Sequence, residues 1–341
     1  MKIKAAILGV SGYTGQQLLS ILSNHNQVTI EAIFGSNTVG KRAGEVLPVT
    51  NYASDIEILD SSNYDFSSID VVFSCLPHRN LHKTVENINS EKIIDLSADF
   101  RFSSAKKYDD YYNFNHRNPK LLEKFVYGLS EINEELIRNS NFIANPGCYP
   151  TSILIPLIPI LNRTNNDVSI MIDAKSGMSG AGKTLTDSNL FVEINENLKP
   201  YKIFTHRHQP EIMEQLEKNN QSFDLTFVPH LIPISRGILS TIYLKNVKEK
   251  YNILRKTLED TYQNSCFVKI LPAGIIPNIK NVLGTNNICI NIFEDNLSDT
   301  IVIISVIDNL IKGAAGQAVQ NMNLMYNLNV CESLKKISVI P

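Results

Sequence analysis

Cys148 is the residue best placed to act as a nucleophile. A proline and a glycine precede it, and Pro150 suits the first turn of the apolar helix expected after it. We therefore expect Cys148 at or just before a helix N-terminus, where the positive end of the helix dipole favours the thiolate and lowers the pKa of the thiol. Backbone N–H groups of the same turn could also stabilise an oxyanion. The pattern predicts a reactive cysteine.

A thiolate nucleophile needs a proton carrier, and two histidines are candidates. His206 and His208 flank Arg207 immediately before a helical pattern in residues 210–218. A helix N-terminus disfavours imidazolium, so a histidine at that position stays neutral and can act as a base. The sequence does not decide between the two histidines.

A glycine-rich loop follows the first strand-like run, residues 3–8, and precedes a helical pattern. Its spacing is G-x-x-G-x-x-G, whereas G-x-G-x-x-G is the commoner form. Glycines at this point permit a tight turn and let helix N–H groups meet a pyrophosphate, although such a loop can also merely connect two elements. The residues expected to bind a dinucleotide here are Gly9, Ser11, Gly12, Tyr13, Thr14 and Gly15.

The end of the second strand-like run indicates which dinucleotide binds. Sites for NAD usually place an acidic residue there to bind the ribose 2′-hydroxyl. Here the residues from Phe34 to Thr38, which include Ser36, contain no acid, and Lys41 and Arg42 follow. Hydroxyls and cations suit a 2′-phosphate, so we predict NADP. The alternative is that Lys41 and Arg42 are solvated loop charges.

Further candidate anion-binding groups lie in three segments. Residues 176–183 combine glycines, hydroxyls and a lysine after an expected strand, while Arg101 and Arg236 lie in separate loops. An arginine can hold a carboxylate or phosphate with two parallel hydrogen bonds. Each of these residues could equally form a surface or structural ion pair.

The order of expected elements predicts two domains in a chain of 341 residues. Short apolar strands alternate with helices in the first part, which is typical of a Rossmann-type parallel sheet covered on both faces. From residue 167 onward, strands with fewer helices indicate an α+β domain. We expect a dinucleotide-binding domain at 1–146 and 309–341, including the last helix, and a catalytic and oligomerisation domain at 147–308.

Composition limits the classes of partner. The net charge is −2 and 19% of residues are charged, without a basic block, which argues against nucleic acid and favours small molecules. The N-terminus does not resemble a signal peptide, and no apolar stretch approaches the roughly 20 residues that span a bilayer. The five cysteines include no C-x-x-C pair, so no metal site is expected. A cytoplasmic location fits best.

Taken together, the motifs closely resemble those of the N-acetyl-gamma-glutamyl-phosphate reductase family, which is related in fold to aspartate-semialdehyde dehydrogenase and is glyceraldehyde-phosphate-dehydrogenase-like. The resemblance covers essentially the whole chain. The segments that carry it are residues 9–15, 75–78, 95–101, 145–151, 176–183, 206–212, 236–237, 284–286 and 308–318.

The resemblance implies NADPH-dependent reduction of an acyl phosphate to a semialdehyde, with release of phosphate, in arginine biosynthesis. It also implies a cytoplasmic homodimer or homotetramer, with Cys148 as the nucleophile that forms a thioester. The acid–base histidine would be His208, slightly favoured, or His206. Residues expected to bind substrate are Arg101, Asn145, Ser176, Arg207 and Arg236, and Ser179, Gly180 and Asn309 are expected to bind the cofactor.

Three alternatives stay open. Aspartate-semialdehyde dehydrogenase performs the same chemistry on a shorter substrate with a free amino group. A lysine-pathway reductase would act on a carrier-bound aminoadipyl phosphate, although the chain has no clear basic run for an acidic carrier. A cofactor-binding sensor would require the cysteine and both histidines to be idle.

Overall fold

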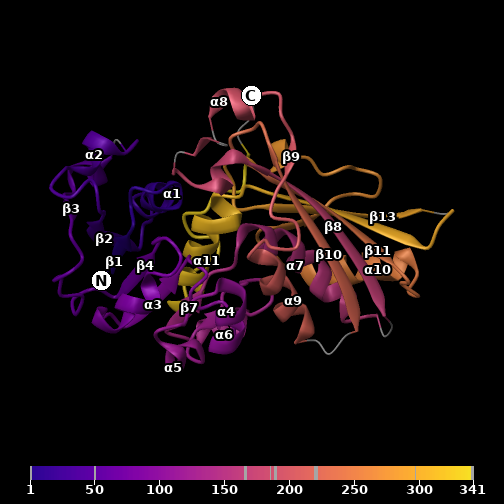
Figure 1. Cartoon of the computed structure of the whole chain (residues 1–341), viewed down its shortest axis with the longest axis horizontal. Helices are drawn as coiled ribbons and strands as arrows, with labels where there is room; N and C mark the ends of the chain where they lie inside the picture. The colour runs from indigo at the N-terminus through magenta and orange to yellow at the C-terminus, as the bar shows by residue number, and fades with distance from the viewer. Residues whose placement is uncertain are drawn as a thin grey trace. The chain divides into compact units, whose positions relative to one another are not determined.

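The computed structural model describes residues 2–49, 51–164, 167–184, 186–187, 190–218, 222–295 and 297–338 (Figure 1). The chain divides into two compact units. The first comprises residues 1–147 and 314–334, and the second comprises residues 148–313 and 335–341. Each unit is built around its own seven-stranded sheet.

The sheet of the first unit is parallel, with strand order β3-β2-β1-β4-β5-β7-β6. The order reverses beside β1, as it does in dinucleotide-binding folds. The strands are mostly apolar, and all four residues of β4 are buried, as expected where helices cover both faces. The strands are β1 (Ile3–Leu8), β2 (Val28–Phe34), β3 (Ile58–Leu59), β4 (Val71–Ser74), β5 (Lys92–Asp95), β6 (Val126–Tyr127) and β7 (Phe142–Ala144).

The helices of the first unit are short, apart from α1 and the helix that returns from the end of the chain. That last helix, α11, joins this unit through buried amides: Gln317 donates to the carbonyl of Gly128 at 2.9 Å, and Asn321 donates to the same oxygen at 2.8 Å. The helices are α1 (Tyr13–Leu22), α2 (Ala43–Val46), α3 (Leu81–Thr84), α4 (Ala105–Tyr112), α5 (Pro119–Leu122), α6 (Glu134–Arg138) and α11 (Gly316–Met325).

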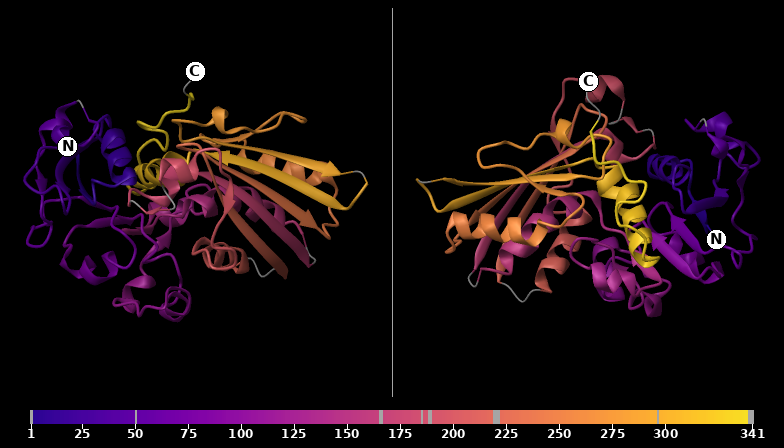
Figure 2. Two further views of the ribbon diagram at one scale, coloured as in Figure 1. Left: turned by 45° about the horizontal axis from the view of Figure 1, so that its top comes forward. Right: turned by 180° about the vertical axis from the view of Figure 1, so that it is seen from behind.

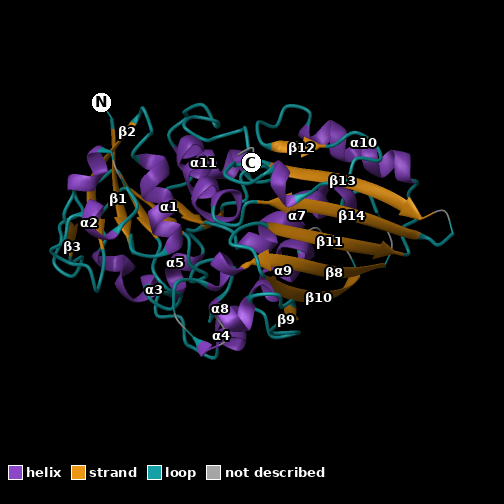
Figure 3. Ribbon diagram, turned by 90° about the horizontal axis from the view of Figure 1, so that it is seen from above, coloured by secondary structure: helices purple, strands orange, loops and turns teal. Residues whose placement is uncertain are grey.

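The sheet of the second unit is mixed, with strand order β12-β13-β14-β11-β8-β10-β9 (Figure 3). The pairs β8–β10 and β12–β13 are parallel, and the other four neighbouring pairs are antiparallel. The strands are β8 (Val168–Gly177), β9 (Lys199–Pro200), β10 (Phe223–Ile232), β11 (Ile238–Lys245), β12 (Val268–Ile270), β13 (Ile288–Asp295) and β14 (Thr300–Ile307).

On one face of this sheet, α7 (Cys148–Leu161) contacts β11 and β14, and α10 (Tyr251–Tyr262) contacts β12 and β13 (Figure 2). Helix α9 (His208–Glu217) packs against α7, and the short α8 (Phe191–Ile194) precedes β9 in the chain. The burial pattern of β8 explains why helices pack on one face of the sheet. Ile170, Ile172 and Ala174 are buried, whereas Met171, between Ile170 and Ile172, is exposed. Period-two alternation of this kind gives a strand one apolar face. Helix α7 is buried all round, from Tyr149 to Leu161, as its apolar sequence predicts.

The observed boundaries differ from the expected ones. The first segment of the first unit ends at residue 147, one residue later than expected. The main segment of the second unit ends at residue 313 instead of 308. Residues 335–338, expected in the dinucleotide-binding domain, belong to the second unit. The reason is local pairing: the backbone N–H of Asn286 donates to Lys335 at 3.0 Å, and the side chain of Asn287 donates to Lys336 at 2.6 Å.

No described helix has both the length and the apolar character needed to cross a bilayer.

Candidate active site

Cys148 is the first residue of α7 in the second unit and is half-buried. This is the position that the proline and glycine before it predicted. The first-turn amides of a helix have no partner within the helix, so they face whatever binds at its start. A thiolate and an oxyanion are both favoured there.

Aromatic rings pack around Tyr149, the residue that follows Cys148. The ring of Tyr149 lies 5.6 Å from His206 and 6.0 Å from His208, with edge-to-face geometry in both pairs. The two histidine rings are 4.8 Å apart, and Phe227 packs 5.3 Å from Tyr149 and 5.6 Å from His206. The structure therefore brings both predicted histidines to the tyrosine that follows the cysteine.

The two histidines are not equivalent. Burial, with smaller contributions from the Arg207 and Lys202 cations, lowers the pKa of His206 to about 3. Its Nδ1 accepts a 3.1 Å hydrogen bond from the backbone N–H of His208, so the neutral ring carries its proton on Nε2. His208 is the first residue of α9 and is also buried. His206 is thus held neutral while it orients the backbone at His208.

Tyr201 completes this cluster, although no sequence motif singles it out. Its ring packs 5.3 Å from His206, and its hydroxyl is hydrogen-bonded to that of Tyr149. Tyr149 also donates to the carbonyl of His230 at 3.1 Å. Burial raises the pKa of Tyr149, and it raises the pKa of Tyr201 to about 12, so both phenols stay protonated. The position of Tyr201 depends on β9 pairing with β10, which no local motif signals.

A second cluster in the same unit joins three predicted segments. The side-chain amide of Asn309 donates to the hydroxyl of Ser179 at 2.9 Å, and its carbonyl oxygen accepts from the backbone of Gly237 at 2.7 Å. A Cβ on Gly180 would stand 2.9 Å from the hydroxyl of Ser176. Arg236 lies 3.7 Å from the buried carboxylate of Asp308. These groups share one end of the β8–β11 pair.

The glycine loop of the first unit has the predicted place between β1 and α1. Gly9 has a φ of +78°, and a Cβ there would stand 2.7 Å from the carbonyl oxygen of Cys75. Gly12 caps α1 without a side-chain hydrogen bond, so the first-turn amides have no side-chain acceptor at the cap. Tyr13 and Thr14 are the first two residues of α1, and Gly15 is buried. Such a loop fits a pyrophosphate.

Residues at the end of β2 reach this loop. The backbone N–H groups of Gly9 and Val10 both donate to the carbonyl of Phe34, at 3.0 and 2.9 Å. The hydroxyls of Ser11 and Thr38 are 3.0 Å apart. Ser36 lies between these contacts in sequence, so the expected 2′-phosphate subsite and the glycine loop are brought together.

The two cations after β2 are placed differently from one another. Arg42 is the N-cap of α2, its guanidinium lies 3.7 Å from the Asp55 carboxylate, and both side chains are highly exposed. Lys41 lies in the preceding turn, where its carbonyl accepts from Ile58 at 2.9 Å. An exposed ion pair is weak, and Arg42 could exchange Asp55 for an anionic ligand.

Arg101 and Asn145 pack against each other within the first unit. Arg101 is buried, with Nε donating to the carbonyl of Asn145 at 2.8 Å and Nη2 donating to that of Leu96 at 3.0 Å. The side chain of Asn145 donates to Ala314 at 3.3 Å and accepts from Asn321 at 3.1 Å. These contacts hold Nε and Nη2 of Arg101, and the substrate-binding role expected for Arg101 and Asn145 stays a prediction.

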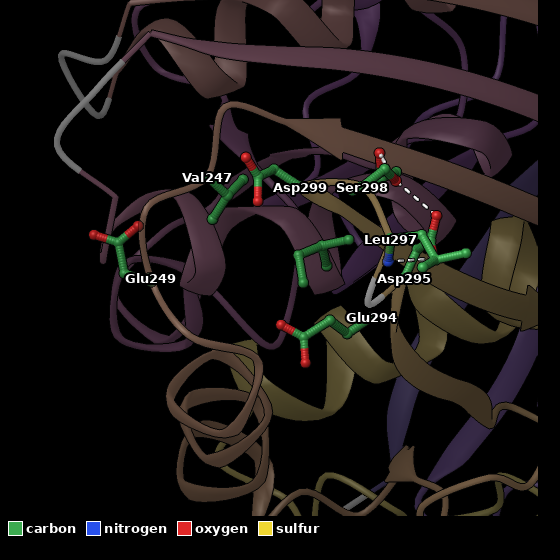
Figure 4. Close-up of a pocket in the computed structure, with 9 residues that line it drawn as sticks. Val247, Glu249, Glu294, Asp295, Leu297, Ser298 and Asp299 are labelled. Atoms are coloured by element: carbon green, nitrogen blue, oxygen red, sulfur yellow. Dashed lines mark hydrogen bonds between the residues drawn. The ribbon is translucent and has the colours of Figure 1, made fainter.

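A pocket of about 370 Å³ lies at the far ends of β13 and β14 (Figure 4). Its lining includes the carboxylates of Glu249, Glu294, Asp295 and Asp299 and none of the predicted site residues. Within the described part of the chain, no group of histidine, cysteine or acidic side chains could hold a metal ion.

Two family models match the chain. One, described as semialdehyde dehydrogenase, NAD binding domain, matches residues 4–140, and the other, described as semialdehyde dehydrogenase, dimerisation domain, matches residues 148–309.

Curated relatives match over nearly the full length. The N-acetyl-gamma-glutamyl-phosphate reductase of Halothermothrix orenii is 43% identical and covers 99% of this chain and 100% of its own. That of Campylobacter jejuni serotype O:2 is 42% identical and covers 98% of each. A probable chloroplastic N-acetyl-gamma-glutamyl-phosphate reductase of Oryza sativa is 42% identical over 96% of this chain and 80% of its own.

Among solved structures, aspartate semialdehyde dehydrogenase II of Vibrio cholerae superposes with a TM-score of 0.74 at 18% identity. The match covers 96% of this chain and 99% of the other. At this identity the likeness is one of fold alone, and it supports the predicted α/β class with its parallel and mixed sheets.

Proposed function

This chain belongs to the semialdehyde dehydrogenase family and, within it, to the N-acetyl-gamma-glutamyl-phosphate reductases, and from that premise we propose that it reduces N-acetyl-γ-glutamyl phosphate to N-acetylglutamate 5-semialdehyde and phosphate, in arginine biosynthesis. The observation that carries the proposal is identity of 41–43% over nearly the full chain, joined to a cysteine at the start of α7 with two histidines packed on the next residue. The enzyme is an oxidoreductase.

We propose NADP as the cofactor. The first-turn amides of α1 and the closely approached backbone at Gly9 and Gly15 fit a pyrophosphate. The hydroxyls of Ser11 and Ser36 and the cations Lys41 and Arg42 would hold the adenosine end. Ser179, Gly180 and Asn309 of the second unit stay predicted cofactor-binding residues. Bound NADPH would supply a hydride to the acyl carbon.

The protein's own chemistry centres on Cys148. Its thiolate, favoured at the start of α7, attacks the acyl carbon, and the carbon–oxygen bond to phosphate breaks with the electron pair leaving on phosphate. The product is a thioester on Cys148. A thioester keeps the acyl group in place and is electrophilic enough to be reduced. Cleavage of the carbon–sulfur bond then releases the semialdehyde and restores the thiolate.

We assign the acid–base role to His208 and a positioning role to His206. With its pKa lowered to about 3, His206 is a poor proton acceptor near neutral pH. Its Nδ1 is already occupied by the backbone N–H of His208. His208 would therefore protonate the oxygen formed at the acyl carbon and take a proton from sulfur as required.

Cationic and polar groups would bind the anionic substrate. Arg207 and Arg236 are the guanidinium groups best suited to its carboxylate and phosphate. Ser176 would add a hydroxyl that is hydrogen-bonded to the hydroxyl of Tyr149. Arg101 and Asn145 would also hold the local backbone in place, because Nε and Nη2 of Arg101 donate to the carbonyls of Asn145 and Leu96 and the side chain of Asn145 donates to that of Ala314.

We also propose that the chain forms a homodimer or homotetramer. The family model of the second unit is described as a dimerisation domain, and the face of its sheet opposite α7 carries exposed Met171 beside Asp173 and Lys175. A second copy would cover this mixed apolar and charged face. The cytoplasmic location expected from the sequence stays a prediction.

The reverse reaction tests the function. N-acetylglutamate 5-semialdehyde, phosphate and either NADP or NAD are mixed with the enzyme, and absorbance of the reduced cofactor is followed. We expect reduction of NADP that depends on phosphate. Turnover of aspartate semialdehyde instead would contradict the substrate and favour the shorter alternative, and turnover of the aminoadipyl analogue would favour the lysine pathway.

A further inference from the structure

Gly313 packs directly against the nucleophile within the second unit. An ideal Cβ built on Gly313 would stand 2.8 Å from the Cβ of Cys148 and 3.2 Å from its Cα. Real Cβ atoms do not approach each other as closely as 2.8 Å, so any larger residue must displace one of the two positions. The absence of a side chain at residue 313 therefore leaves room for the side chain of Cys148.

The backbone at Gly313 does not itself require glycine. The φ angle of Gly313 is not positive, so alanine could adopt its conformation. It lies in a helical turn, where glycine is less stable than alanine because it loses more chain entropy on folding. A glycine kept there has a packing or functional reason, and the Cys148 contact supplies one.

Hydrogen bonds to Asp308 hold the turn that contains Gly313. Residues Ile311–Ala315 form a π-helical turn, and the N–H of Gly313 donates to the carbonyl of Asp308 at 3.0 Å, an i to i+5 bond. The carboxylate of Asp308 is fully buried and accepts from the backbones of Leu310 at 2.9 Å and Gly284 at 2.9 Å. The turn thus has little freedom to retreat from Cys148.

We propose that Gly313 is a positioning residue for the thiol: because Gly313 places no side chain of its own against Cys148, the π-helical turn sets where the sulfur lies at the start of α7. The inference rests on the proposed role of Cys148 as nucleophile. Gly313 lies against the Cα and Cβ of the nucleophile, so we expect its contribution on the bond-forming step more than on binding.

The test is Gly313→Ala, with two readouts. At saturating cofactor and substrate, we expect kcat to fall about tenfold or more, because small misplacements of a reacting atom are costly, while KM and the dissociation constant for NADPH change less than about twofold. The rate at which iodoacetamide alkylates Cys148, measured against pH, should shift as well. A wild-type alkylation profile together with wild-type kcat would overturn the proposal.

Two controls separate positioning from general crowding. Ile307 Cδ1 would also lie 3.2 Å from the new Cβ, and Ile307→Val removes that atom. We expect Ile307→Val alone to be active and the double variant to stay slow, whereas recovery in the double variant would attribute the loss to Ile307 and sink the inference. Gly44→Ala, whose Cβ would meet that of Ser54 at 2.8 Å in the first unit, should leave the alkylation profile unchanged.

The alkylation readout does not depend on the substrate. If the wild-type protein fails to reduce N-acetyl-γ-glutamyl phosphate, the proposed function fails, but the response of Cys148 to Gly313→Ala still decides the inference. If the wild type is active and the alanine variant is equally active with an unchanged profile, the inference alone fails.

Discussion

The Nδ1 of His206 accepts a hydrogen bond of 3.1 Å from the backbone N–H of His208. This relationship ties the buried, neutral ring of one histidine to the first residue of α9, where the second histidine begins the helix. His206 and His208, which the sequence does not distinguish, therefore have different environments.

Replacing His206 tests this division of roles. Asparagine places an oxygen close to the position of Nδ1 and can still accept from the backbone of His208, whereas leucine cannot. We expect kcat to fall by less than about tenfold in His206→Asn and by clearly more in His206→Leu, with His208→Asn the most damaged because it removes the proton carrier. Equal loss in the two His206 variants would remove the positioning role.

Burial of His206 makes stability depend on pH. Its pKa is lowered from 6.5 to about 3 on folding, so below pH 6.5 the unfolded chain binds a proton that the folded chain does not. This group therefore does not lower the free energy of unfolding above pH 6.5. As the pH drops from 6.5 toward 3, it makes the folded state less stable by at most about 1.4 kcal/mol per pH unit.

Urea unfolding of wild type and His206→Asn between pH 7 and pH 4 measures that slope. The variant should lose part of the pH dependence while other titrating groups keep theirs. An identical slope in the two proteins would mean that His206 titrates normally in the fold.

Cys148→Ser should abolish turnover, with a loss greater than about a thousandfold, because a serine hydroxyl in this setting is a far weaker nucleophile than a thiolate. NADPH binding, followed by fluorescence titration, should stay near the wild-type value since the glycine loop is untouched. Substantial residual activity would contradict the thioester mechanism.

The glycine loop offers a matched pair of substitutions. Gly9→Ala meets both a φ of +78° and the Cys75 carbonyl, whereas a Cβ on Gly12 meets nothing nearer than the Gly9 oxygen at 3.7 Å. We expect Gly9→Ala to lower the unfolding free energy by about 1–3 kcal/mol and Gly12→Ala to change it little. Thermal unfolding without cofactor checks both, and similar values would show that the loop tolerates a side chain at Gly9.

Arg42→Ala should weaken NADPH binding more than NADH binding if the cation holds the 2′-phosphate. Because its present partner Asp55 is an exposed carboxylate, little stability should be lost on removing the pair. Isothermal titration with both dinucleotides gives the comparison. An equal loss of affinity for NADPH and NADH would show that Arg42 is a surface charge that does not bind the 2′-phosphate.

Local sequence determined much of the fold and part of the site. The apolar strands of the first unit, the glycine loop between β1 and α1, and the start of a helix at Cys148 all follow from residues adjacent in the chain, since turns, caps and hydrophobic period depend on neighbours. The family resemblance rested on the same local segments, which is why the reductase family could be identified before any contact was known.

Tertiary structure decided the rest. The bond from Asn309 to Ser179 spans 130 residues, Tyr201 reaches His206 through strand pairing, and the low pKa of His206 comes mainly from burial. Nε and Nη2 of Arg101 donate to the carbonyls of Asn145 and Leu96, contacts that its sequence context does not indicate. Contacts of this kind depend on how whole elements pack, and desolvation is a property of the packed interior, so neither can be read from residue types and spacing.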